Sequence, residues 1–308
     1  MHKKYLTIAI PTYNRSKILE NSLKSLTNQD FFIDNQYVEI VVSDNFSTDD
    51  TEIVCNEYVE KYPGKFHYHK NPTNIGDKNF HKSLSCGSGE FLKLSNDSLI
   101  YKQGSLQHMV ELIKQKKENK PVLFFLNNSI QTPTRSYELK NLDDFITEVS
   151  YFSTWIACFG IWKVDFDNLD DFNRLSELRL TQVDVLFRML SEPNRQSLVD
   201  NNEIFRVQDV GGKGGYGLFK VFVENYFYIL DRYNINANVR NKEKVKILLK
   251  HVVIFDAESL FKNSFLKESR LKALIDNSKN IKAVIPIYYL YYLIYWIKFF
   301  VKFKLLKY

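Results

Sequence analysis

Polar and acidic side chains follow three short apolar segments, each at the point where the apolar run stops. Residues 11–15 (Pro-Thr-Tyr-Asn-Arg) follow the first, residues 43–45 (Ser-Asp-Asn) the second, and residues 95–98 (Ser-Asn-Asp-Ser) the third. Carboxylates, amides and hydroxyls each make several hydrogen bonds, so they are the groups that build a polar ligand site. If the three segments are parallel strands of one sheet, these groups meet outside the carboxyl ends of the strands, where ligands bind.

The hydrophobic pattern and the turn residues predict the strands and helices that position these polar groups. Residues 6–10, 38–42, 66–69 and 90–94 predict strands, and residues 16–28, 49–62 and about 78–86 predict helices between them. Strands that alternate with helices about every 30 residues are typical of βαβ units. We therefore expect an α/β fold with a mostly parallel sheet and helices on both of its faces.

The second half of the chain gives weaker signals. Residues 122–126 predict a strand, residues 175–190, 219–233 and 242–261 predict helices, and the polar residues 129–144 predict a loop. Residues 211–215 (Gly-Gly-Lys-Gly-Gly) lack the preceding strand and the following Lys-Ser/Thr of a phosphate-binding P-loop.

Composition excludes several classes of protein. The 308 residues are 44% hydrophobic, which is ordinary for a globular chain and argues against disorder. The three cysteines are far apart, have no metal-ligand spacing and predict a reducing compartment. The first residues do not resemble a signal peptide, so we expect a cytoplasmic protein. The net charge of +6 is accompanied by no nucleic-acid-binding motif, so no nucleic-acid partner is expected.

Residues 5–107 resemble family 2 glycosyltransferases of the GT-A fold. The motifs that carry the resemblance occur in register: residues 10–15 (Ile-Pro-Thr-Tyr-Asn-Arg), 41–49, 71–76 (Asn-Pro-Thr-Asn-Ile-Gly), 88–91, 94–98 and 104–106. The remainder is similar, more loosely, to bacterial enzymes that build surface polysaccharide, including abequosyltransferase-like enzymes. The resemblance implies a Rossmann-like GT-A domain and inverting transfer of a sugar from a nucleotide-sugar donor.

The resemblance also assigns the donor-binding residues. Asp44 is expected at the base or ribose of the donor, where a carboxylate can accept two hydrogen bonds; the alternative is an Asp that caps a turn. Arg15 faces either phosphate or solvent. The full set of expected donor-binding residues is Pro11, Thr12, Tyr13, Asn14, Arg15, Asp44, Asn74, Gly76, Asn96 and Asp97.

The metal position departs from the family pattern. Family members carry Asp-x-Asp or Asp-Asp-Asp after the fourth strand, and Mg²⁺ or Mn²⁺ bridges those carboxylates to the diphosphate. Here the residues are Asn96, Asp97 and Ser98, and a hydroxyl is a much weaker ligand than a carboxylate. Three alternatives stay open: Asp97 holds a hydrated Mg²⁺ or Mn²⁺, lysine or arginine replaces the metal, or the site is inactive.

The catalytic base departs from the pattern as well. Inverting transfer needs a base for the acceptor hydroxyl, and the matching stretch is residues 181–185 (Thr-Gln-Val-Asp-Val). Gln182 falls at the base position, where an amide cannot act, and Asp184 is the nearest carboxylate. On a regular helix Asp184 lies about 200° around from Gln182. Asp184 is the candidate base, a surface ion pair with Arg188 is the alternative, and two more remote carboxylates are Asp165 and Asp167.

The C-terminal segment has a membrane-like composition. Residues 283–297 are 15 consecutive apolar or aromatic residues, and Lys298, Lys302, Lys304 and Lys307 follow. This run is shorter than the roughly 20 residues that cross a bilayer. An in-plane helix at an anionic membrane surface is the favoured interpretation. Packing on the catalytic domain or a second subunit, and a true span, are the alternatives.

These inferences give one leading hypothesis. Residues 1–235 form the catalytic domain, with a nucleotide-sugar-binding half (1–107) and an acceptor half (108–235), and residues 236–308 form a helical region that ends in the membrane-associating tail. The chain transfers a sugar to a glycan acceptor, lipid-linked, in bacterial O-antigen or capsule synthesis at the inner face of the cell membrane. The alternative is a non-catalytic subunit that binds nucleotide sugar or glycan, with degenerate metal and base positions.

Overall fold

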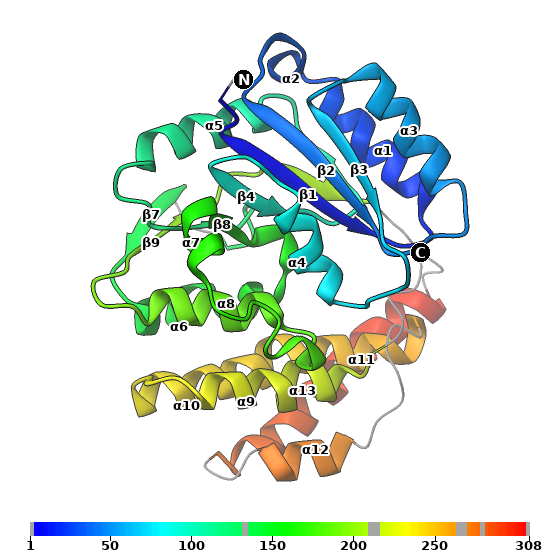
Figure 1. Ribbon diagram of the computed structural model, residues 1–308. Coiled ribbons are helices and arrows are strands. Elements are labelled where there is room, and N and C mark those ends of the chain that lie inside the picture. Colours follow the sequence, from blue (N-terminus) through cyan, green and yellow to red (C-terminus); the bar gives the residue numbers. More distant parts are fainter. Residues whose placement is uncertain (1–2, 131–134, 209–215, 263–269, 278–280, 306–308) are drawn as a thin grey trace.

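A five-stranded sheet forms the centre of the N-terminal half. The computed structural model describes residues 3–130, 135–208, 216–262, 270–277 and 281–305 (Figure 1). The strand order is β3-β2-β1-β4-β8, with β1–β4 parallel and β8 antiparallel to β4. The strands are β1 (Leu6–Thr12), β2 (Val38–Asp44), β3 (Phe66–Lys70), β4 (Phe91–Leu94) and β8 (Gly160–Trp162). The expected α/β fold is confirmed.

Helices cover both faces of this sheet, as its two-sided apolar strands require. On one face, Ile8 and Ile10 of β1 share a buried cluster with Leu19 and Leu23 of α1. On the other face, β1 belongs to a second cluster through Ala9. The first cluster includes α1 (Ser16–Thr27), α2 (Asp30–Asp34), α3 (Thr51–Lys61) and α5 (Ser105–Lys116), and the second includes α4 (Lys78–Ser85).

Two smaller sheets complete the α/β part. β9 (Ser197–Asp200) lies between β6 (Val122–Phe125), which is parallel to it, and β7 (Ser136–Leu139), which is antiparallel. β5 (Leu99–Tyr101) pairs with β10 (Phe205–Val207). The loop expected over residues 129–144 is wrong, because β7 and the start of α6 (Leu142–Val149) lie there. β7 is a short edge strand, and the Asn141 side chain caps α6 by accepting from the Asp144 N–H at 2.9 Å.

The helix expected over residues 175–190 is divided. A turn at Ser176–Leu178 (η3) ends at Arg179, whose φ of 60° is left-handed, and α8 covers Thr181–Leu190. A left-handed residue cannot continue an α-helix. The chain therefore changes direction at Arg179, and α8 starts as a separate helix. Preceding α8 are two short turns, η1 (Ser150–Thr154) and η2 (Ile156–Cys158), and helix α7 (Lys163–Asn168).

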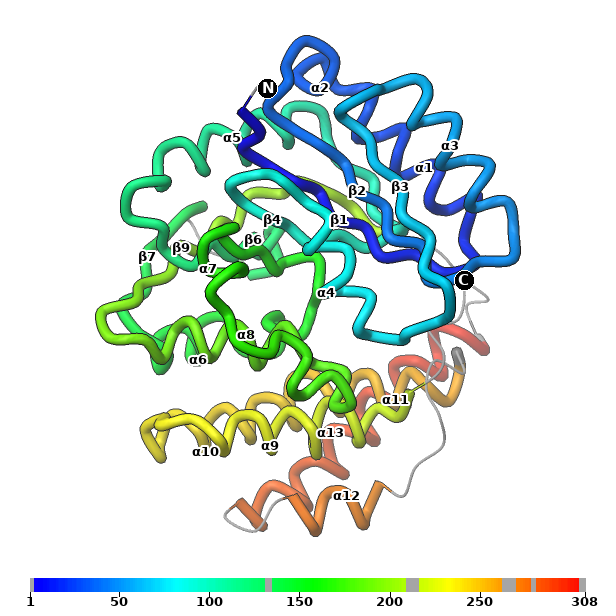
Figure 2. The backbone as a smooth tube through the Cα atoms, viewed as in Figure 1, coloured from blue at the N-terminus to red at the C-terminus, as the bar shows by residue number. Residues whose placement is uncertain are grey.

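A layer of helices packs beneath the α/β part (Figures 1 and 2). It consists of η4 (Lys220–Asn225), α9 (Tyr226–Asp231), α10 (Ala237–Lys246), η5 (Ile247–Val252), α11 (Val253–Lys262), α12 (Arg270–Asn277), α13 (Val284–Phe300) and η6 (Val301–Leu305). The buried cluster that contains Leu94 and Phe187 continues through Leu230 to Tyr288 of α13. The layer therefore shares its core with the α/β part. Residues 211–215, and Lys307 of the tail, lie outside the described residues.

Candidate active site

A cleft of about 320 Å³ opens beside the carboxyl end of β4. Segments that are distant in the sequence form its walls: the residue before α1, the start of α4, the residues after β4, the start of α8, and η4. The polar and aromatic side chains on which the following description depends are Arg15, Asp77, Asn96, Arg179, Gln182 and Phe222.

Thr12, the last residue of β1, links two of the predicted acidic residues. Its hydroxyl donates to Asp97 Oδ2 at 3.0 Å, and in the strand register its Cα is opposite Asp44 of β2. Arg15 Nη1 reaches Asp97 Oδ1 at 3.2 Å, so both oxygens of this carboxylate are engaged. Asp97 is 5% exposed, and burial raises its pKa although Arg15 and Thr12 act in the opposite direction. Asp44 and Asp97 thus lie at the same edge of the sheet, as the sequence predicts.

Asp44 is enclosed by the protein itself. It is fully buried; Oδ1 accepts from the Ser47 N–H at 2.9 Å and Oδ2 from the Tyr68 hydroxyl at 2.8 Å. Its neighbours at the end of β1 are more open, since Pro11 is half-buried and Tyr13 is 46% exposed. In this arrangement a ligand contacts Asp44 only after Tyr68 or the Ser47 turn moves.

Side-chain amides hold together the loops at this edge. Asn14 has a left-handed φ of 51°, and its Oδ1 accepts from the Thr48 N–H at 2.8 Å. Asn45 Nδ2 donates to Asn74 Oδ1 at 2.8 Å, and its Oδ1 accepts from the Ile75 N–H at the same distance. Gly76 adopts φ +59°, which favours glycine in the turn that leads into α4. Asn14 and Asn74 therefore shape the predicted donor side as parts of the loops.

Gln182 faces the cleft from the first turn of α8. It is 1% exposed, and its Nε2 donates to the Thr154 carbonyl at 2.6 Å. Its Oε1 is buried and has no hydrogen-bond partner among the described residues, and the same is true of Asn96 Oδ1. Both amides line the cleft. A buried acceptor without a partner costs free energy, so the two oxygens are ready to accept from a bound hydroxyl.

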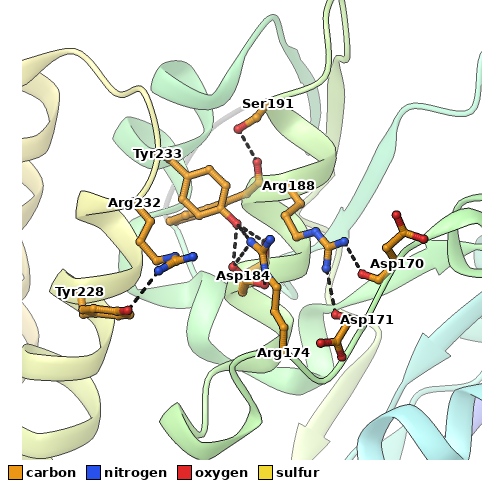
Figure 3. A network of polar contacts seen from close by, with 10 residues as sticks. Asp170, Asp171, Arg174, Asp184, Arg188, Ser191, Tyr228, Arg232 and Tyr233 are labelled. Atoms are coloured by element: carbon orange, nitrogen blue, oxygen red, sulfur yellow. Dashed lines mark hydrogen bonds and ion pairs between the residues drawn. The ribbon is translucent and has the colours of Figure 1, made fainter.

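Asp184 belongs to a different network on the other side of α8 (Figure 3). Arg174 forms a two-pronged ion pair with it, Nε to Oδ2 at 2.8 Å and Nη2 to Oδ1 at 2.7 Å, and the Tyr233 hydroxyl donates to Oδ1 at 2.7 Å. Asp184 is 1% exposed and is not among the described residues that line the cleft. Arg188 instead donates to the carbonyls of Asp170 and Asp171. The ion pair that the sequence suggests between Asp184 and Arg188 is therefore wrong.

The two remote alternatives for the base are also paired elsewhere. Asp165 forms an ion pair with Arg195, and Asp167 with Lys163 four residues before it. Neither is among the described residues of the cleft.

Asp77 is the carboxylate that sequence reasoning did not single out. It lies at the start of α4 and lines the cleft, and its side chain makes no capping hydrogen bond to that helix. Burial raises its pKa, and the charge of Arg179 opposes that shift. The Arg179 guanidinium lies 5.8 Å from the centre of the Tyr216 ring, which also lines the cleft. A carboxylate and a guanidinium thus line the same cleft as Arg15 and Asn96.

Comparison with known proteins identifies the family. The model of glycosyl transferase family 2 matches residues 7–162, which is 156 of the 308 residues. The chain belongs to glycosyl transferase family 2. It is 36% identical over 115 residues to abequosyltransferase RfbV of Salmonella typhimurium, covering 35% of this chain and 34% of that relative. It is 34% identical over 111 residues to GalNAc(5)-diNAcBac-PP-undecaprenol beta-1,3-glucosyltransferase of Campylobacter jejuni, covering 34% of this chain and 33% of that relative. The matches therefore span about a third of these curated relatives.

Solved structures share the GT-A fold of this family 2 chain over most of its length. S. aureus TarS 1–349 in complex with UDP matches with a TM-score of 0.60 at 18% identity, covering 96% of this chain and 89% of that one. The mannosyltransferase PcManGT from Pyrobaculum calidifontis in complex with GDP-Man and Mn²⁺ matches with a TM-score of 0.57 at 13% identity, covering 96% and 88%. At these identities the likeness supports the fold alone.

The residues of this family 2 chain do not fit a preformed divalent-metal site. Mg²⁺ and Mn²⁺ prefer several oxygen ligands with carboxylates among them. At the expected position Asp97 is the one carboxylate, and Thr12 and Arg15 engage both of its oxygens. In the described part of the chain, no three histidine, cysteine or acidic side chains are grouped as metal ligands. Ser98 lines the cleft beside Asn96, and neither carries charge.

The signals for the missed residues are present in the sequence but short. Asp77 directly follows the Asn74-Ile75-Gly76 motif, so a search for carboxylates after that motif finds it. Asn45 ends the second polar cluster and organises the next loop through its side chain. Arg179 has a left-handed backbone just before α8, and no glycine or asparagine stands there that would predict this conformation.

Proposed function

We propose that this chain transfers a sugar from a nucleotide-sugar donor to a glycan acceptor, with inversion, in the cleft beside β4. The observation that carries the proposal is that a family 2 chain has Arg15, Arg179 and Asp77 on the walls of one cleft at the carboxyl end of its parallel sheet. Residues 1–107 supply most of the donor side and also the base Asp77, and residues 108–235 supply most of the acceptor side and also Arg179. Residues 236–308 form the helical region.

The donor diphosphate is balanced by arginine. Guanidinium groups bind phosphate oxygens through two parallel hydrogen bonds and remain charged at all relevant pH values. Arg15 is 44% exposed on its side chain and can turn from Asp97 toward the diphosphate, and Arg179 lines the same cleft. Pro11, Tyr13, Asn14, Asn74 and Gly76 line the nucleotide, with Asp44 behind them; Thr12 and Asp97 hold Arg15 in place before the donor arrives.

Asp77 is the base that we assign in place of Asp184. The acceptor hydroxyl oxygen attacks the anomeric carbon from the face opposite the diphosphate, its proton passes to the Asp77 carboxylate, and the bond from the anomeric carbon to the diphosphate breaks. The nucleoside diphosphate leaves, and the configuration inverts. A raised pKa makes Asp77 a stronger base than an ordinary aspartate. Gln182 Oε1, which has no described partner, accepts from a second acceptor hydroxyl and orients the sugar.

The acceptor is a lipid-linked glycan of bacterial O-antigen or capsule synthesis, and the protein works at the inner face of the cell membrane. The names of the relatives support this, since one transfers to a GalNAc(5)-diNAcBac-PP-undecaprenol and another is an abequosyltransferase. Among the described residues, one helix, Val284–Lys304, is long and apolar enough to cross a membrane by length and composition. Because α13 packs along α11, we propose that it lies in the plane of the surface.

Donor binding and turnover test this function separately. Thermal shift with UDP, GDP, CDP and dTDP, each with Mn²⁺ and with EDTA, should give stabilisation by one nucleotide without metal, because a ligand stabilises the folded state by mass action. Stabilisation that needs Mn²⁺ would contradict the arginine assignment. The second candidate is a non-catalytic subunit, which the ion pair between Arg15 and Asp97 favours. Release of nucleoside diphosphate from a sugar donor then distinguishes an enzyme from such a subunit. Binding without any release would favour that subunit.

A further inference from the structure

A second groove, of about 860 Å³, lies in the helical layer between α10–η5 and α13. Lys242, Lys246 and Lys250 form one wall, at a spacing of four residues along the α10–η5 helix. Tyr291 and Tyr295 of α13 form the other wall. The described lining also includes the aliphatic side chains of Val245, Leu249 and Ile281. The groove thus combines lysines, tyrosines with hydroxyl groups, and aliphatic side chains.

The charge of this groove is one-sided. None of the described residues that line it is acidic. Lys244, on the other side of α10, is by contrast paired with Asp231 at 2.7 Å. The lysines affect their surroundings, because burial together with the charges of Lys246 and Lys250 lowers the pKa of His251 to about 4. An anion bound here would therefore meet lysines and no acidic side chain among the described lining residues.

An exposed apolar strip of α13 runs beside the groove. Ile287, Leu290, Ile294 and Ile297 are 43%, 57%, 51% and 50% exposed. Tyr291 follows Leu290 on the same helix, so the strip and the aromatic wall are adjacent. Lys298, which is exposed, lies on the same side of the helix as Tyr291 and Tyr295 by its spacing of seven and three residues.

We propose that this groove binds the phosphate of an anionic phospholipid in a bilayer, while the apolar strip of α13 enters the acyl boundary. A phospholipid combines an anionic phosphate and acyl chains within one short distance, which matches the lysine wall and the adjacent strip. Tyrosine is suited to the headgroup region, where one end of the ring is apolar and the other wet. The inference rests on the membrane association proposed above and adds the site and the lipid charge that it requires.

The experiment is flotation of the full-length chain with two kinds of vesicle. One is phosphatidylcholine alone, and the other contains about 30 mol% phosphatidylglycerol, which gives a negative surface potential that attracts basic segments. We expect flotation with the anionic vesicles and at least about tenfold weaker binding to the neutral ones. The double variant Lys242→Glu/Lys250→Glu should lose about 30-fold or more in binding to anionic vesicles.

Matched variants exclude general effects of charge and folding. Lys61→Glu/Lys117→Glu makes the same charge change on the α/β part and should alter binding by less than about twofold, since its lysines are remote from the groove. Lys242→Gln/Lys250→Gln should show an intermediate loss. Nucleotide-induced thermal stabilisation should be unchanged in all variants, because the donor cleft lies elsewhere.

Three outcomes would overturn the proposal. Equal flotation with both vesicles, unaffected by the groove variants, would leave membrane association standing without this site. No flotation with either vesicle would contradict membrane association itself. The proposed sugar transfer would remain testable by itself, in an assay with a soluble donor. A doubled mass in light scattering that the groove variants reduce to that of a monomer, without flotation, would assign the surface to a second copy of the chain.

Discussion

At the scale of single residues, the acidic side chains differ in whether their oxygens are already bonded. Asp44, Asp97 and Asp184 each have both oxygens engaged by protein donors. Asp77 lines the cleft, makes no capping bond, and is influenced by Arg179 through charge. Availability of the carboxylate, more than position in a motif, therefore separates a candidate base from an acid that holds the fold together.

Replacing Asp77 by Asn should slow sugar transfer by about 10²- to 10⁴-fold, the range that general-base catalysis contributes. The amide keeps the shape of the side chain but cannot take a proton, so nucleotide-induced thermal stabilisation should remain. The measurement is kcat for release of nucleoside diphosphate with acceptor present. An Asp77→Asn enzyme that keeps its full rate would return the assignment of the base to another group.

The pH dependence of transfer gives a second test of Asp77. The base acts when it is deprotonated, so the rate should fall as the pH falls through the pKa of Asp77. Because burial raises that pKa, the acid limb should lie above the ordinary aspartate value. The limb should disappear in the Asn variant; a limb that persists there belongs to a different carboxylate.

Arg174 should contribute more to stability than a surface cation does. Replacing it by Ala leaves the Asp184 carboxylate, which is 1% exposed, without a cation and with the neutral Tyr233 hydroxyl as its described side-chain partner. Breaking a buried pair costs about 3 kcal/mol. Lys163→Ala removes an exposed pair with Asp167 and should cost less than about 1 kcal/mol. Urea unfolding measures both, and equal losses would contradict a structural role for the Arg174–Asp184 pair.

At the scale of elements, the sequence predicts the first half of the fold well because local pattern and long-range packing agree there. β1, β2, β3 and β4 lie within two residues of their expected ranges, and their ends bring Thr12, Asp44 and Asp97 to one edge. The second half is less predictable: β7 has only four residues, and although Ser-Tyr-Glu-Leu alternates polar and apolar residues, this pattern is too short to stand out in a polar segment.

The candidate site is predictable in part for the same reason. Arg15, Asn96 and Asp97 follow the ends of predicted strands, so the sequence places them at one location. The start of α8 depends on tertiary packing, which the local sequence does not predict. The left-handed backbone at Arg179 turns Gln182 toward the cleft and leaves Asp184 on the opposite side, and no local residue preference announces that break. On a regular helix Gln182 and Asp184 lie about 200° apart, so the sequence already indicates that both side chains cannot face the same cleft.

Gly89 tests how closely β1 and the turn before β4 approach. A Cβ at this position would lie 2.7 Å from the backbone N of Thr7, so one of the two segments must shift. Gly89→Ala should cost about 1–3 kcal/mol of the free energy of unfolding, as overpacking does. Gly64→Ala, at φ +73° with no atom within 4 Å of its Cβ, should cost only the backbone strain of about 1 kcal/mol. A smaller loss at Gly89 than at Gly64 would contradict the close approach.

At the scale of the whole molecule, the helical layer is part of the core and not an appendage. Tyr288 of α13 is fully buried and its hydroxyl donates to Asp256 of α11 at 2.8 Å, while Arg270 forms an ion pair with the same Asp256. Removal of residues 283–308 therefore uncovers Asp256 and the apolar side chains around it. The truncated chain should lose stability in addition to any loss of membrane binding, so point variants are the cleaner probe.

Tyr288→Phe should destabilise the chain by about 1.5–3 kcal/mol, the range for a hydrogen bond to a charged group, without changing flotation on vesicles. Tyr291→Phe, at an exposed position of the same helix, should leave the unfolding midpoint within the error of the measurement. Thermal unfolding of the two variants side by side distinguishes a helix packed into the core from one that is only attached.

A series of ring contacts leads from the cleft toward the outer groove. Phe222, on the wall of the cleft, lies 5.5 Å from Tyr151 between ring centres, and Tyr151 lies nearly parallel to His251 of η5 at 4.6 Å. Lys250, the neighbour of His251, faces the outer groove. Closely packed rings repack together when one of them moves. Vesicles should then alter the rate of sugar transfer to a water-soluble acceptor that never enters the lipid phase. Such a change in rate would be interfacial activation that arises within the protein, because the local concentration of this acceptor does not rise at the membrane.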